Sequence, residues 1–149
     1  MGRRRLFFSS ILVFAIVFSS CQNKLDFPLY PQHEYSEVSL KIIPYEDSFS
    51  KDENSYLIYI FSYSCGHCLE IKNMMIEFVI NEKKPTYFII FNSEIELASD
   101  VSSTIGASSI EELSILGVPT LINIEDGKVA FNVAGVKAIT EIIEPYFRT

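Results

Sequence analysis

Residues 56–68 of this chain read YLIYIFSYSCGHC, and this stretch decides how the sequence folds. Its first six residues form an apolar run of strand length, and the residues after it have the apolar spacing of a helix. Two thiols, Cys65 and Cys68, therefore lie one helical turn apart at the start of that helix, with His67 between them. A Cys-x-x-Cys pair in this context is typical of a redox dithiol.

The elements around this stretch alternate between strand and helix. The run at 56–62 is apolar at nearly every position, which predicts a central strand with both faces covered. Further elements follow from apolar spacing, Pro85 and an Asp-Gly turn. They are a strand at 38–43, a polar helical segment at 45–51, a helix at 66–81, a strand at 86–91, one interrupted or two short helices within 94–116, strands at 120–124 and 128–133, and a helix at 138–146.

Two separated blocks of sequence carry a family resemblance. One is FSYSCGHC at 61–68, and the other is LGVPTL at 116–121, followed by Asp126-Gly127-Lys128 and Gly135. With these motifs in this order, the region 38–147 resembles a thioredoxin-family domain. The resemblance implies an α/β fold, a thioredoxin-like three-layer sandwich in which a central mixed β-sheet is flanked by helices on both faces.

The resemblance also implies a role for each cysteine. Unpaired N–H groups and the helix dipole at a helix N-terminus stabilise a thiolate, and Cys65 is in that place. By resemblance, Cys65 is the attacking nucleophile and Cys68 resolves the mixed disulfide, so that the pair closes a Cys65–Cys68 disulfide when oxidised. The electrons reside in the dithiol, so no cofactor is implied.

His67 and the proline of the second block complete the expected site. A partly protonated imidazole favours the thiolate, and Cys-Gly-His-Cys also occurs in protein disulfide isomerase, whose potential is about -180 mV against about -270 mV for thioredoxin. The motif therefore favours oxidation or isomerisation. The resemblance implies a cis bond between Val118 and Pro119, which would present the Val118 backbone to an extended substrate segment. The alternative is an ordinary strand-initiating proline.

The chain departs from thioredoxin at two positions near the dithiol. Ser64 replaces the tryptophan before the first cysteine, and Tyr59 replaces the buried aspartate that assists the resolving thiol. Glu70 could take over that proton transfer, or be a solvated carboxylate on the helix surface. These departures argue against a housekeeping thioredoxin.

The first twenty residues have the pattern of a secretory signal peptide. Arg3, Arg4 and Arg5 precede an apolar stretch at 6–18 that is shorter than a bilayer span of about 20 residues. Cys21 then follows two serines, as the acylated cysteine follows the small residues of a bacterial lipobox, although Phe18 stands where leucine is usual. We expect a lipoprotein signal at 1–20 and lipidation of Cys21; the alternative is a plain signal with a free thiol.

Residues 21–37 contain two prolines and no regular periodicity, which indicates a tether before a domain at 38–149. We expect His33 to be a solvent-facing residue of this tether. The alternative is an extra ordered segment packed through Phe27, Leu29 and Tyr30.

The net charge of the chain argues against some classes of binding partner. The formal net charge of -7 argues against binding to nucleic acid, and 149 residues suit one globular domain, which we expect to be a monomer. The sequence predicts an exported, lipid-anchored thiol-disulfide oxidoreductase of a bacterial cell envelope. Its partners would be cysteine-containing proteins and an upstream redox partner.

Two other functions remain open on the sequence alone. In one, Cys65, His67 and Cys68 bind a metal, but zinc sites usually have four ligands and His33 is distant, so we expect no metal. In the other, the fold serves a binding or transport accessory lipoprotein, similar to bacteriocin-transport accessory factors, with secondary redox activity. A free dithiol outside the cytoplasm argues against a purely structural role.

Overall fold

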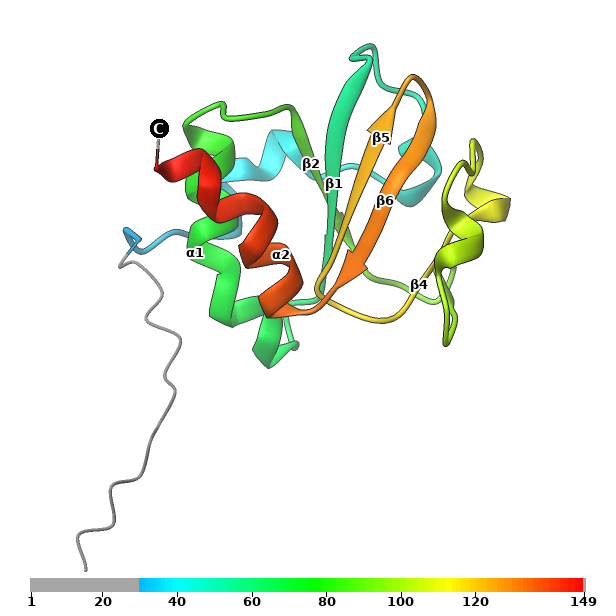
Figure 1. Ribbon diagram of the computed structural model, residues 1–149. Helices are drawn as coiled ribbons and strands as arrows, with labels where there is room; N and C mark the ends of the chain where they lie inside the picture. Colours follow the sequence, from blue (N-terminus) through cyan, green and yellow to red (C-terminus); the bar gives the residue numbers. More distant parts are fainter. Residues whose placement is uncertain (1–29, 149) are drawn as a thin grey trace, which may run out of the picture.

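A four-stranded mixed sheet lies at the centre of the computed structural model, which describes residues 30–148 (Figure 1). The strand order is β2-β1-β5-β6. Strands β1 (Ser55–Phe61) and β2 (Thr86–Ile90) run parallel, whereas β5 (Thr120–Glu125) is antiparallel to both β1 and β6 (Lys128–Ala134). This topology confirms the expected thioredoxin-like α/β fold.

Strand β1 is buried on both faces, as its unbroken apolar run predicted. Leu57, Tyr59 and Phe61 face the core beneath the helices, and alternate residues such as Ile58 and Ile60 face a second core on the other side. All five are at most 2% exposed. Because both faces of β1 are covered, nearly every position of the strand is apolar and buried.

The two α-helices pack against the same face of the sheet (Figure 1). Helix α1 (Gly66–Ile80) begins directly after the dithiol loop, and α2 (Val136–Ile143) follows β6 and continues into the 3-10 turn η5 (Glu144–Phe147). Their buried side chains, including Ile71, Met75 and Ile139, meet Phe88 and Leu121 of the sheet. Met74 and Met75 of α1 are also buried in this core.

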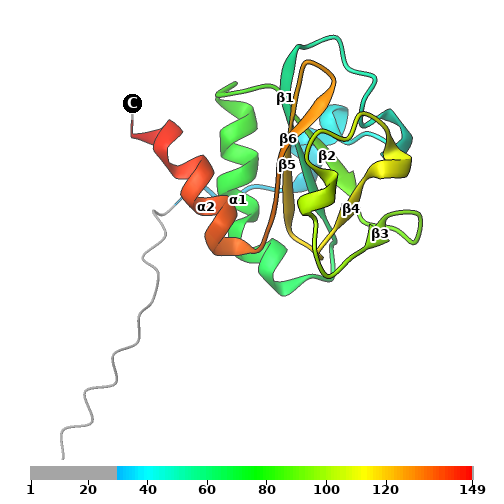
Figure 2. The same cartoon turned by 45° about the vertical axis from the view of Figure 1, so that its right-hand side comes forward.

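The opposite face is covered by the chain between β2 and β5 (Figure 2). We expected one or two α-helices within 94–116, and that expectation was wrong. The segment instead forms β3 (Glu96–Leu97), the 3-10 turns η3 (Ser102–Thr104) and η4 (Ile110–Glu112), and β4 (Ser114–Ile115). Asp100 accepts hydrogen bonds from the amide and hydroxyl of Ser102, and such local side-chain bonds compete with a helix.

The expected strand at 38–43 was also wrong. Most of it belongs to the 3-10 helix η1 (Tyr35–Lys41), and only Ile42 forms a bridge with β2, at Phe88. Glu34 and Glu37 form a capping box that starts this helix. The alternating Val38 and Leu40 therefore do not share a sheet face: Val38 is buried, whereas Leu40 is almost fully exposed.

The short segments before and after the sheet complete the fold. The polar segment expected at 45–51 is a single 3-10 turn, η2 (Tyr45–Asp47). The Asp-Gly hairpin between β5 and β6 is confirmed, with φ of 48° at Asp126 and 73° at Gly127.

Within the described part of the chain, no helix is long and apolar enough to cross a membrane. The signal peptide expected at 1–20 and Cys21 lie outside the described residues.

Candidate functional site

Cys65 is the N-cap of helix α1. The chain leaves β1 at Phe61 and turns through Ser62, whose carbonyl oxygen accepts a hydrogen bond from the Cys65 amide at 3.2 Å. The Cys65 sulfur in turn accepts a hydrogen bond from the Cys68 amide at 3.1 Å. The first helical N–H groups and the helix dipole thus point toward this sulfur, and both favour its thiolate.

The two sulfurs differ in their access to solvent. Cys65 and Cys68 form a disulfide across the first turn of α1, with Cα atoms 5.2 Å apart. Cys65 is partly exposed, whereas Cys68 is fully buried in the core beneath α1. Only Cys65 is placed to meet the sulfur of another protein, and Cys68 is placed to attack Cys65 from inside.

The second sequence block lies against the first. The Val118-Pro119 bond is cis, and the carbonyl oxygen of Val118 is 3.5 Å from the Cys65 sulfur. The Pro119 carbonyl accepts a hydrogen bond from the Gly135 amide at 2.8 Å, which ties this loop to the start of α2. The expected cis bond and the expected position of Val118 beside the dithiol are both confirmed, although their sequence positions are more than fifty residues apart.

His67 lies on the exposed surface of α1, and its ring contacts Glu70 three residues further along the helix. Its Nδ1 lies 3.1 Å from Glu70 Oε1, and both side chains are at least half exposed. Any influence of His67 on the dithiol therefore acts through charge rather than contact. Glu70 is a surface carboxylate, as one of the two sequence interpretations held.

Tyr59 stands at the position where thioredoxin has a buried aspartate. It is fully buried in the same core as Cys68 and Tyr35. Burial raises the pKa of Tyr59 strongly, and the neighbouring Tyr35 phenol raises it further. Tyr35 is close enough to affect the pKa of Tyr59. The Tyr59 hydroxyl nevertheless forms no hydrogen bond of ordinary geometry with any described residue. Tyr59 is consequently not a proton acceptor at physiological pH.

The expected exposure of His33 was wrong. Its side chain is buried between η1 and α1, where its ring contacts Glu37 and Glu77 and its amide donates to Asn73. Residues 30–37 therefore pack on the domain instead of serving as a free tether. Burying an imidazole requires partners for both nitrogens, and the second carboxylate comes from a helix more than forty residues away.

Sequence reasoning also missed the aromatic residues beside the dithiol. Tyr35 stacks on Phe61 with ring centroids 4.0 Å apart, and Tyr63 meets Tyr35 edge-on at 5.4 Å. Burial raises the pKa of Tyr35 to about 12. The signal available in the sequence was the position of Tyr63, two residues before Cys65. Nothing in the sequence indicated that Tyr35 would join it.

Metal ligands do not gather in this part of the molecule. Among residues 30–148, no group of three or more His, Cys, Asp and Glu side chains could hold a metal ion. The geometry of Cys65, Cys68 and Val118 suits thiol-disulfide exchange.

This chain resembles solved thioredoxin structures at low sequence identity. No protein-family model and no curated protein matches this chain. Among solved structures, oxidised mitochondrial thioredoxin 3 of Saccharomyces cerevisiae is similar at 16% identity and a TM-score of 0.47, covering 74% of this chain and 98% of its own. Thioredoxin f2 of Chlamydomonas reinhardtii is similar at 10% identity and a TM-score of 0.46, covering 72% and 94%. Plasmodium falciparum thioredoxin is similar at 19% identity and a TM-score of 0.45, covering 71% and 98%.

Proposed function

We propose that this chain is an exported thiol-disulfide oxidoreductase that exchanges disulfides with cysteine-containing proteins. The observation that carries the proposal is the position of the Cys65 sulfur. It is partly exposed at the N-terminus of α1 and lies 3.5 Å from the Val118 carbonyl, while its partner Cys68 is buried behind it. This arrangement separates an attacking thiol from a resolving thiol.

Reduction of a substrate would proceed in two exchanges. The Cys65 thiolate attacks one sulfur of a substrate disulfide, forming a mixed disulfide and releasing the other substrate sulfur as a thiolate. Cys68 then attacks the Cys65 sulfur, which closes the Cys65–Cys68 disulfide and releases the second substrate thiolate. The dithiol loses two electrons and the substrate gains them; oxidation of a substrate dithiol is the reverse sequence.

The surrounding backbone would orient the substrate. An extended substrate segment can pair with the backbone of Val118 in the manner of an added strand, which would align its cysteine with Cys65. His67 would favour the thiolate through its charge and so move the couple toward oxidation or isomerisation. An upstream redox partner would restore the dithiol or the disulfide after each turnover.

Single substitutions at the two cysteines test this function. We expect Cys65→Ser to abolish reduction of insulin and reactivation of scrambled ribonuclease, and Cys68→Ser to trap mixed disulfides that a non-reducing gel resolves. Full activity in both variants would overturn the proposal and favour a binding or transport accessory role. The reduction potential of the pair gives the direction: a value near -180 mV supports an oxidant or isomerase, and one near -270 mV supports a reductant.

Export and lipidation belong to the same proposal and are supported by residues 1–21 of the sequence. Mass spectrometry of the mature N-terminus should find a diacylglycerol-modified Cys21 in the membrane fraction of a bacterial host. Recovery of an unmodified N-terminus, with the chain free of the membrane, would overturn the lipid anchor while leaving the redox function intact.

A further inference from the structure

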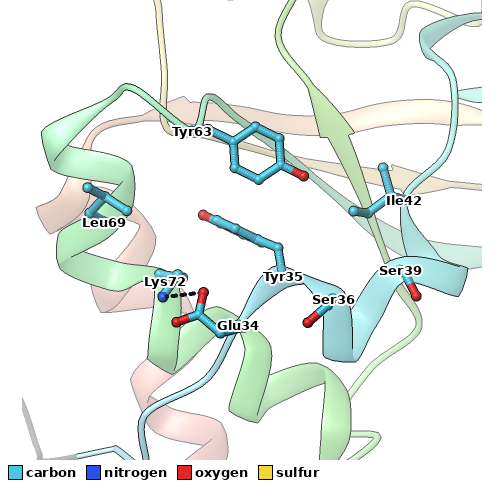
Figure 3. Close-up of a pocket in the computed structure, with 8 residues that line it drawn as sticks. All are labelled: Glu34, Tyr35, Ser36, Ser39, Ile42, Tyr63, Leu69 and Lys72. Carbon is cyan, nitrogen blue, oxygen red and sulfur yellow. Dashed lines mark hydrogen bonds and ion pairs between the residues drawn. The ribbon is translucent and has the colours of Figure 1, made fainter.

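A groove of about 460 Å³ opens beside the dithiol loop (Figure 3). Tyr35 and Ile42 line it from the N-terminal segment, Tyr63 from the dithiol loop and Leu69 from α1. In Figure 3 the Tyr63 ring lies directly above the Tyr35 ring, with Leu69 on one side of the pair and Ile42 on the other. The groove is therefore mainly apolar and is built from segments that are distant in the sequence.

The groove and the Val118-Pro119 loop belong to parts of the fold on different sides of strand β1. The dithiol loop follows β1, which stands between β2 and β5 in the sheet. Helix η1 contacts β2 and α1, whereas Pro119 directly precedes β5. A substrate segment that pairs with Val118 and places its cysteine at Cys65 would therefore extend beyond that cysteine toward the groove.

The groove presents apolar surface that the fold leaves uncovered. Tyr63 is 56% exposed and Leu69 is 51% exposed, although each lies within four residues of Cys65. The Tyr63 ring is nevertheless held in place, because it meets both Tyr35 and Phe61 edge-on at about 5 Å. A rigid, half-exposed aromatic ring offers contact area at little cost in conformational entropy.

The charges at the groove cancel. Lys72 Nζ is 3.2 Å from Glu34 Oε2, and these are the charged residues among those that line the groove. Elsewhere the chain is strongly acidic, with a formal net charge of -7. The groove is thus a neutral, apolar position near the dithiol, where an apolar side chain can leave water without burying an unpaired charge.

We propose that this groove binds a large apolar side chain, such as phenylalanine or leucine, that lies near the reacting cysteine of a protein substrate. This inference rests on the proposed function and gives its substrate class: protein segments in which a cysteine has apolar neighbours, as in chains that have not completed folding. The groove selects the segment, and the dithiol carries out the exchange.

Two peptides that differ only in apolar character test the groove. Each carries one cysteine blocked as a mixed disulfide with thionitrobenzoate, with phenylalanine or serine two residues to either side. The Cys65 thiolate of the reduced full-length protein attacks the peptide sulfur and expels coloured thionitrobenzoate; Cys68 then attacks Cys65 and releases the peptide thiol. The dithiol supplies the two electrons, so a single turnover needs no other reductant.

We expect the phenylalanine peptide to react about tenfold faster at low peptide concentration, which is the lower end of what burial of a large apolar side chain provides. Leu69→Ser and Tyr63→Ser should reduce that ratio toward one. Leu40→Ser is the matched control, since Leu40 is on η1 but is 97% exposed and does not line the groove. The serine peptide is an internal reference, because general damage to the dithiol slows both peptides equally.

The proposed role of the groove is overturned if the ratio is close to one in the natural protein, or if Leu69→Ser and Tyr63→Ser leave it unchanged. In either case the exchange itself still supports the proposed function. If neither peptide releases thionitrobenzoate, the proposed function fails. Whether the groove binds apolar side chains is then tested separately by measuring peptide binding. For that measurement, fluorescent peptides with serine in place of cysteine are titrated with the Cys65→Ser, Cys68→Ser double variant. Tighter binding of the phenylalanine peptide by about tenfold supports the groove, and equal binding overturns it.

Discussion

His33 and Glu77 are 44 residues apart in the sequence, and their side chains meet with Nε2 and Oε2 2.6 Å apart. The other ring nitrogen of His33 lies 3.0 Å from Glu37, so the imidazole joins η1 to α1. This connection holds down the segment that carries Tyr35, and thereby one wall of the groove beside the dithiol.

Removing the imidazole should loosen this segment. We expect His33→Ala to lower the free energy of unfolding by about 1–3 kcal/mol, because it deletes two partly buried hydrogen bonds to carboxylates and leaves a gap between η1 and α1. Urea denaturation measures the change. His67→Ala is the matched control: this histidine also pairs with a glutamate, but at an exposed position, where such pairs contribute about 0–1 kcal/mol. Equal losses in the two variants would contradict a structural role for His33.

The same contact makes stability depend on pH. Burial by itself would lower the pKa of His33, but its hydrogen bonds to Glu37 and Glu77 outweigh that effect and raise the pKa above 6.5. The imidazolium therefore stabilises the fold fully below pH 6.5, and that contribution is lost as the pH rises through the raised pKa. The free energy of unfolding should decline over this range in the natural protein and not in His33→Gln. Parallel curves for the two proteins would show that another group is responsible.

Tyr59 should be replaceable by phenylalanine. Its buried hydroxyl completes no hydrogen bond of ordinary geometry within the described residues, so Tyr59→Phe should change the free energy of unfolding by less than about 1 kcal/mol. Because burial raises its pKa far above the working range, the pH dependence of the exchange rate should also stay the same. A displaced pH profile in Tyr59→Phe would mean that the phenol takes part in proton transfer to or from Cys68.

His67 should influence the dithiol through its charge. Because its ring is exposed and lies against Glu70, we expect His67→Ala to lower the reduction potential by only about 10–30 mV at low ionic strength. The difference should shrink in 1 M salt, where the Debye length is about 3 Å. Equilibration with glutathione at both salt concentrations measures it. A shift that is insensitive to salt would indicate an effect of shape or packing instead.

The hairpin between β5 and β6 requires its glycine. Gly127 has φ of 73°, and no atom lies within 4 Å of the position of an added Cβ, so the cost of Gly127→Ala is one of backbone conformation alone. We expect a loss of about 1–2 kcal/mol in the free energy of unfolding. Gly66→Ala is the control, because Gly66 is helical and equally uncrowded, and alanine there should be neutral or stabilising. A loss of the same size at Gly66 would contradict the conformational explanation.

The sequence by itself determined the elements whose cause is local. The spacing of Ile71, Met74 and Met75 predicted α1, the Asp126-Gly127 pair predicted the hairpin, and the unbroken apolar run predicted that β1 is central. The position of Cys65 at a helix N-terminus was also predicted from local patterns, the apolar run before it and the helical spacing after it. Neighbouring residues set these features, so reading along the chain is sufficient.

The tertiary structure alone decided the features that depend on distant partners. The alternation of Val38 and Leu40 looked like a strand, but the chain forms a 3-10 helix there, and His33 just before it is held against Asn73 and Glu77 of α1. The stretch after β2 contributes Ile95, Leu113 and Ile115 to the core that contains Ile58 and Ile60, a contact between segments distant in the sequence. The groove joins Tyr35, Tyr63 and Leu69 from three segments. Burial and hydrogen bonding between such segments contribute free energy only once the chain has folded, and no pattern of adjacent residues records them.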